Sequence, residues 1–125
     1  MFKIIWLVRF RKDKATEEVL HWWRGHHAEL ARSTPGMIRY VQSHWRSGLD
    51  PATGLPGAEP QFDGHAEHWF ESYATYQAAM ASPEWAATIA DGPSHFDSTT
   101  LVGGELDEFV VTWDTRPDGP AYPPT

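Results

Sequence analysis

Residues 2–10, FKIIWLVRF, constrain the fold more than any other part of the chain. β-Branched and aromatic side chains dominate this run, which predicts a strand. Because successive strand residues point to opposite faces, Ile4 and Trp6 face one way while Ile5 and Leu7 face the other. Both faces in the middle of the strand are therefore apolar, and both faces of its sheet need to be covered.

The remaining elements follow from hydrophobic periodicity and from the positions of turn residues. Thr16, with acidic residues directly after it, is expected to cap the first helix. We expect helices over 17–32, 73–81 and 83–91, strands over 37–45, 64–71 and 105–113, and a long loop over 47–62. With the last two helices counted as one segment, the order is β-α-β-β-α-β, the ferredoxin-like arrangement.

Two helical segments can cover only one face of a four-stranded sheet, so the other apolar face needs a partner. We expect an α+β domain with an antiparallel four-stranded sheet, helices on one face, and a second copy of the chain on the other face. This homodimer would form through the sheet. The domain is expected over 1–113, and the proline-rich segment 114–125 is expected to be an extended tail.

The charge balance narrows the possible partners. There are 17 acidic and 10 basic residues, for a net charge of −7, and no large cluster of Lys or Arg. Nucleic acids and membrane surfaces both attract positive patches, so neither is an expected partner. The apolar run at the N-terminus is too short to span a bilayer. The chain has no cysteine, and we expect a cytoplasmic protein.

Two adjacent histidines on the first helix are the first candidates for chemistry. The apolar stripe of that helix centres near Trp23 and Leu30, and His26 and His27 lie on opposite sides of that centre. Periodicity alone does not choose between them. An imidazole that faces a tryptophan-lined interior is suited to proton transfer, although a core histidine hydrogen-bonded to a neighbour fits the same pattern.

Polar residues on two strands are further candidates. Tyr40 and Gln42 share one face of the second strand, and the phenol can orient a substrate oxygen, pass a proton, or simply pack. Glu67 and Trp69 share a face of the third strand. The carboxylate of Glu67 would orient the helix histidine or act as a base, unless it is a glutamate of the surface or the dimer edge.

Metal and nucleotide sites are not expected. His65 and His68 are three apart on a strand and point to opposite faces, and the side chains of His26 and His27 diverge by about 100° on a helix. No zinc-binding spacing is present. No glycine pattern for NAD or flavin binding is present either.

Four segments, in order, resemble the EthD family, a branch of the dimeric α+β barrel proteins. They are WRGHHAEL at 23–30, similar to W-R-x-x-H-x-P-L; PGMIRYVQ at 35–42, similar to P-G-L-x-x-Y-x-Q; DGHAEHWF at 63–70, similar to D-G-x-A-E-x-W-F; and DGPSHFD at 91–97, similar to D-E-x-x-F-x-D. The resemblance extends over 2–113. Glu29 replaces the family's usual proline, and Gly92-Pro93 replaces the acidic residue that usually follows Asp91.

The resemblance implies a dimeric α+β barrel and selects His27 as the histidine of the site. It also implies an enzyme or enzyme accessory, of oxidoreductase, isomerase or dehydratase type, in a degradation or secondary-metabolism pathway. The substrate would be a small, largely apolar molecule, aromatic or lactone-like, handled without a cofactor. The expected catalytic residues are His27, Tyr40 and Glu67, and the expected binding residues are Trp23, His26, Gln42 and Trp69.

The sequence also allows two alternatives. The first is a non-catalytic protein that binds or carries a small molecule in the same pocket. The second is a haem-binding protein, since some relatives of the wider fold hold haem through a single axial histidine.

Overall fold

The computed structural model describes residues 1–122. Two turns differ from the α-helices around them: η1 is π-helical and η2 is 3₁₀. The elements, in chain order, are β1 (Phe2–Val8), α1 (Thr16–Trp22), η1 (Trp23–His27), α2 (Ala28–Arg32), β2 (Met37–His44), β3 (Gly48–Leu49), β4 (Pro56–Ala58), β5 (Gly64–Phe70), α3 (Tyr73–Met80), α4 (Pro83–Asp91), η2 (Gly92–Ser94) and β6 (Val102–Leu106).

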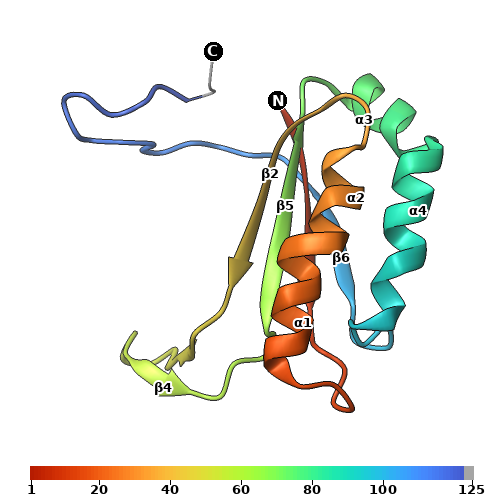
Figure 1. Ribbon diagram of the computed structural model, residues 1–125. Helices are drawn as coiled ribbons and strands as arrows, with labels where there is room; N and C mark the ends of the chain where they lie inside the picture. The colour runs from red at the N-terminus through yellow and green to blue at the C-terminus, as the bar shows by residue number, and fades with distance from the viewer. Residues whose placement is uncertain (123–125) are drawn as a thin grey trace.

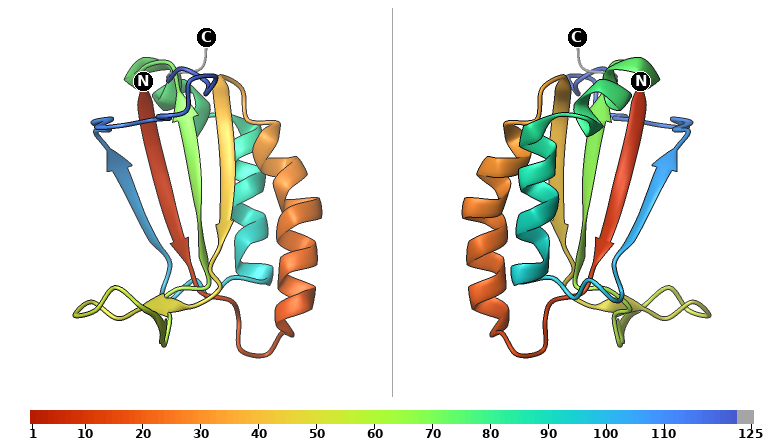
Figure 2. Two further views of the ribbon diagram at one scale, coloured as in Figure 1. Left: turned by 90° about the vertical axis from the view of Figure 1, so that its left-hand side faces the viewer. Right: turned by 90° about the vertical axis from the view of Figure 1, so that its right-hand side faces the viewer.

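The main sheet has four strands in the order β2-β5-β1-β6, and each neighbouring pair is antiparallel. The helices pack on one face of this sheet and leave the other face open (Figure 1). Figure 2 shows that the helices are displaced toward the β2 edge, so that β6 stands clear of them. The predicted ferredoxin-like α+β fold is confirmed. None of the helices within residues 1–122 is both long and apolar enough to cross a lipid bilayer.

The apolar core lies between the sheet and the helices, in two clusters. One joins the end of β1 to the first helix and the segment after η2, and its buried members include Val8, Val19, Trp22, Trp23 and Phe96. The other joins the start of β1 to α3 and α4, through Ile4, Phe70, Ala79 and Trp85. Burying aromatic side chains of this size supplies much of the driving force for folding.

The first helix is continuous from α1 through η1 to α2, but its middle turn is π-helical. A π turn has i→i+5 hydrogen bonds and is often found at functional sites. The expected cap at Thr16 is wrong, because Ala15 holds the N-cap position and no side chain bonds there. The caps of the later helices are side chains: Ser72 accepts a bond from Thr75 N–H, and Ser82 accepts one from Trp85 N–H.

The last strand differs from the prediction over 105–113. It spans Val102–Leu106, pairs with β1, and includes two glycines, whose low strand propensity hid it in the sequence. The apolar residues over 109–113 lie beyond this strand in irregular backbone. The expected loop over 47–62 also contains a small hairpin, β3–β4.

The open face of the sheet bears the second apolar side of β1. Ile5 and Leu7 lie on this face, and Val41 on β2 lies on it as well. The β3–β4 hairpin and the segment after β6 both leave the sheet on this side, opposite the helices (Figure 1). They expose large apolar side chains, among them Leu49, Leu55, Phe109 and Val111.

Candidate active site

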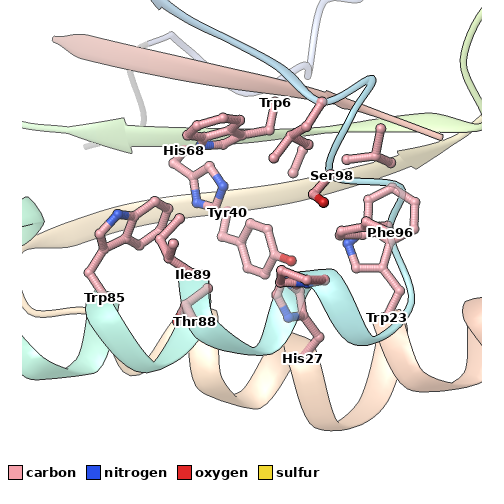
Figure 3. Close-up of a pocket in the computed structure, with 15 residues that line it drawn as sticks. Trp6, Trp23, His27, Tyr40, His68, Trp85, Thr88, Ile89, Phe96 and Ser98 are labelled. Carbon is pink, nitrogen blue, oxygen red and sulfur yellow. The ribbon is translucent and has the colours of Figure 1, made fainter. Parts of the chain in front are cut away.

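A cavity of about 270 Å³ lies between the sheet and the helices. Its walls are mostly aromatic and aliphatic, and two of its lining residues, Ile89 and Leu101, are also exposed at the surface. In another protein an apolar cavity of about 150 Å³ already holds benzene, so this one has room for a molecule of one or two rings. Figure 3 shows the side chains that surround it, including His27, Tyr40, His68, Trp6, Trp85 and Ser98.

His27 reaches the cavity from the π-helical turn. The residue is 8% exposed, whereas the side chain of the adjacent His26 is 66% exposed. The Nδ1 atom of His27 lies 3.0 Å from Oδ2 of Asp91 at the end of α4. A carboxylate can only accept, so Nδ1 carries the proton and Nε2 has the free lone pair.

Two effects act on the protonation of His27. Burial lowers its pKa below the ordinary value, because a charged imidazolium is poorly solvated in an apolar cavity. The hydrogen bond and the charge of Asp91 oppose this change without cancelling it. The imidazole is therefore neutral near pH 7 and able to act as a base.

Asp91 is itself held in place by the first helix. The indole Nε1 of Trp22 donates to the same Oδ2 atom at 3.0 Å, and the Trp22 ring packs against the imidazole of His27 with centroids 4.5 Å apart. His26 Nε2 lies 3.6 Å from the other carboxylate oxygen. Asp91 thus fixes both the tautomer and the orientation of His27, as the aspartate of a catalytic triad does.

Tyr40 provides a hydroxyl donor in the same cavity. Its oxygen accepts a hydrogen bond from Gln42 Nε2 at 2.7 Å, and the same nitrogen donates to the backbone carbonyl of Trp23 at 2.8 Å. A carbonyl only accepts, so the nitrogen of the Gln42 amide must face it. Since Gln42 occupies a lone pair of the phenol, the O–H of Tyr40 remains free to donate. Burial raises the pKa of Tyr40, which keeps this proton in place.

His68 is the second histidine of the cavity, and it was not predicted. It lies on β5, opposite Ile4 of β1, and only 3% of it is exposed. Its ring stacks on Tyr40 with centroids 4.7 Å apart and meets the ring of Trp85 edge-on at 5.4 Å. Burial lowers the pKa of His68 to about 4, so it is neutral at physiological pH.

The structure brings together some of the residues expected from the sequence. His27, Tyr40 and Trp23 line the cavity. Gln42 supports it by holding the hydroxyl of Tyr40, and His26 lies at the surface.

Glu67 and Trp69 do not belong to this cavity, which corrects the expectation that Glu67 orients the helix histidine. On β5 they alternate with His68, and they face the open side of the sheet. Glu67 pairs there with Lys3 and lies 3.2 Å from Nε2 of His65. The indole of Trp69 donates to the hydroxyl of Tyr122 at 2.9 Å. Asp91, and not Glu67, is the carboxylate that orients His27.

The missed residues carry weak signals in the sequence. Asp91 stands in one of the segments that resemble the EthD family, but an acidic residue at a helix end is ordinary. His68 and Trp6 share the helix-facing side of their strands with core residues, so both look like packing residues. Among residues 1–122, no three histidine or acidic side chains come together as metal ligands would.

Comparison with known proteins identifies relatives of the whole fold. The sequence model of the EthD domain matches residues 11–99. An EthD family protein from Bacillus halodurans C-125 is 22% identical, with a TM-score of 0.72 over 87% of this chain and 99% of that one. A dimeric ferredoxin-like protein of unknown function from Thermobifida fusca is 15% identical, with a TM-score of 0.59 over 84% of this chain and 88% of that one.

A third similar structure is an antibiotic biosynthesis monooxygenase. It is 15% identical, with a TM-score of 0.53 over 87% of this chain and 99% of that one. At these identities the structural likeness concerns the fold alone. No curated protein sequence matches the chain.

Proposed function

The chain belongs to the EthD family, and from this premise we propose that it is an enzyme that moves protons on a small, largely apolar molecule, aromatic or lactone-like. The reaction would use the protein's own side chains as acid and base. The observation on which the proposal rests is the His27–Asp91 pair opening on an apolar cavity beside the hydroxyl of Tyr40.

The proposed reaction begins with removal of a proton from a carbon next to a carbonyl group. Nε2 of His27 takes the proton, and Asp91 stabilises the imidazolium that forms. The O–H of Tyr40 donates to the carbonyl oxygen as negative charge develops on it, which lowers the barrier most in a cavity that excludes water. His27 then returns the proton to a different carbon, giving an isomer, or to a departing hydroxyl group, giving water and a dehydrated product.

Reactions of this kind suit an apolar cavity with few polar groups. The substrate's own carbonyl holds the electrons, so the protein needs to supply only a base, a donor and a dry pocket. The similar antibiotic biosynthesis monooxygenase makes oxidation of a small molecule a third reaction class to include in substrate screens.

The same cavity bears on both alternatives from the sequence. A haem has four pyrrole rings and fits poorly into about 270 Å³. A non-catalytic carrier needs the apolar walls but has no use for a carboxylate that fixes the tautomer of a cavity histidine. The His27–Asp91 pair therefore favours the enzyme.

We propose that the working unit is a homodimer formed through the open face of the sheet. The apolar side chains of Ile5, Leu7 and Val41 support this assembly. The hairpin and the segment after β6 extend from the same face, where they would flank a second sheet (Figure 1). The dimeric relative from Thermobifida fusca has the same fold.

The test compares wild type with His27→Ala and His26→Ala on a panel of lactones, phenols and cyclic ketones. The two histidines are adjacent, but only His27 reaches the cavity, so His26→Ala is the matched control. We expect turnover to fall at least a hundredfold in His27→Ala, the usual contribution of general base catalysis, and to persist in His26→Ala. Binding without turnover in wild type, or turnover that survives His27→Ala, would refute the proposal.

A further inference from the structure

The cavity has a second polar end that the proposed reaction leaves unused. His68 lies there, across the ring of Tyr40 from its hydroxyl end, with Trp6 beside it (Figure 3). The surrounding walls are apolar, including Trp85 and Ile89. A polar atom in such a place discriminates strongly between ligands, because a buried group left without a partner costs free energy.

The tautomer of His68 follows from its neighbour on β2. Its Nδ1 atom lies 3.2 Å from the sulfur of Met37. A thioether can only accept, so the proton of the neutral ring belongs on Nδ1 and the lone pair on Nε2. Among residues 1–122 this Nε2 has no hydrogen-bond partner, and it is accessible to solvent. His68 therefore offers an acceptor to the cavity.

The neighbouring Trp6 does not add a donor to this end of the cavity. Its Nε1–H has no hydrogen-bond partner within the described part of the chain, but it is closed off from solvent, so a ligand in the cavity does not reach it. The accessible acceptor on His68 therefore sets the preference, and a hydroxyl group complements it by donating a hydrogen bond. A carbonyl or ether oxygen can only accept, so either would leave Nε2 of His68 unpaired. A carboxylate gains nothing from a histidine that stays neutral.

On these grounds we infer that His68 is a recognition residue that selects substrates bearing a hydroxyl group, as a phenol or an enol, at the end of the molecule away from His27. This inference rests on the proposed function, since it takes the same cavity to be the substrate site. It narrows the substrate class from apolar aromatic molecules to hydroxylated ones.

The test is equilibrium binding of β-naphthol and of its methyl ether, followed by tryptophan fluorescence. Neither compound needs to react. The ratio of the two affinities is measured in wild type and in His68→Phe, which keeps a ring to stack on Tyr40 but removes Nε2. Because each ligand's hydration is the same with both proteins, the change in this ratio isolates the hydrogen bond. We expect the preference for naphthol to fall about tenfold, the effect of one buried hydrogen bond.

His65→Phe is the matched control, since it makes the same change on the same strand but on the open face. An unchanged ratio in His68→Phe, an equal change in His65→Phe, or no binding of either ligand to wild type would overturn the inference. If His68→Phe does not fold, imidazole NMR of wild type gives the answer. The Nε2 signal of His68 should shift with naphthol and stay in place with the ether, and any other pattern counts against the role.

The two proposals fail separately. If the ratio of the naphthol and ether affinities depends on His68 but no turnover depends on His27, the protein is a hydroxyl-selective carrier and the proposed enzyme activity is refuted. If turnover depends on His27 but the affinity ratio does not depend on His68, the enzyme proposal stands and the recognition role of His68 is refuted.

Discussion

Replacing Asp91 separates the charge of this residue from its hydrogen bonds. In Asp91→Asn an amide oxygen can still accept from Trp22 and from His27, both of which lie 3.0 Å from the present carboxylate oxygen. Asp91→Ala removes the acceptor altogether and leaves two buried donors unpaired. The asparagine variant therefore tests the electrostatic effect on His27, and the alanine variant tests the clamp between α4 and the first helix.

The expected magnitudes follow from these contacts. A hydrogen bond to a charged group contributes about 1 to 2 kcal/mol more than a neutral one. Because each 1.4 kcal/mol is a factor of ten in rate, Asp91→Asn should lower turnover about five- to thirtyfold. Its effect on stability should be smaller than that of the alanine variant, because both hydrogen bonds are kept. Asp91→Ala should lower the free energy of unfolding by about 2 to 6 kcal/mol, since each of the two unpaired buried donors costs about 1 to 3 kcal/mol.

The pKa of His27 distinguishes an effect of Asp91 on the catalytic histidine from an effect on stability alone. Imidazole NMR and the pH profile of turnover both measure this pKa. Asp91 raises this pKa against the larger effect of burial, so its neutralisation should lower the pKa further. A base with a lower pKa stays unprotonated in more acidic solution, so the acid limb of the profile should move to lower pH. An unchanged pKa together with unchanged turnover in Asp91→Asn would refute the role given to Asp91.

Three other results are expected. The pKa of His68 is about 4 in the folded chain and about 6.5 in the unfolded chain, so the unfolded state binds more protons as the pH falls. Between pH 7 and pH 4.5, the free energy of unfolding should therefore fall by about 2 to 3 kcal/mol more in wild type than in His68→Phe. Urea titration at the two pH values measures this difference. Val41→Lys puts a charge on the open face and should yield a monomer by light scattering that still binds β-naphthol, and a monomeric wild type would contradict the assembly. A Cβ at Gly103 would lie 2.5 Å from the indole of Trp6, so Gly103→Ala should weaken naphthol binding several-fold through overpacking. Gly104→Ala, whose nearest contact is a side-chain carbon at 3.9 Å, should not.

The fold was accessible from the sequence because its strongest pattern is local. Alternation along β1 places Ile4 and Ile5 on opposite faces, and two helical segments can shelter only one of them. The last strand was misplaced because Gly103 and Gly104 carry no strand signal of their own. They form a strand only because β1 provides the hydrogen-bonding edge, which is information from elsewhere in the chain.

The site was less accessible because it depends on which face of a strand meets the helices. Alternation shows that Glu67 and Trp69 share one face of β5 and that His68 is on the other, but it does not say which face is covered. The pairing of β5 with β1 decides this by setting His68 beside Ile4, under the helices. The sequence therefore suggests Glu67 as the partner of His27, although Glu67 lies on the opposite face of the sheet.

The choice between His26 and His27 depends on a feature that periodicity cannot express. A rotation of 100° per residue places the two histidines on either side of the apolar stripe, so that either one could face the interior. In the π turn from Trp23 to His27, hydrogen bonds skip one more residue, so each residue rotates the chain by less than 100°. The smaller steps bring His27 back under the buried Trp23 and leave His26 pointing outward. Asp91 and Trp22 then hold His27 in that orientation, so the irregular turn is what converts an ambiguous pair of histidines into one base aimed at the cavity.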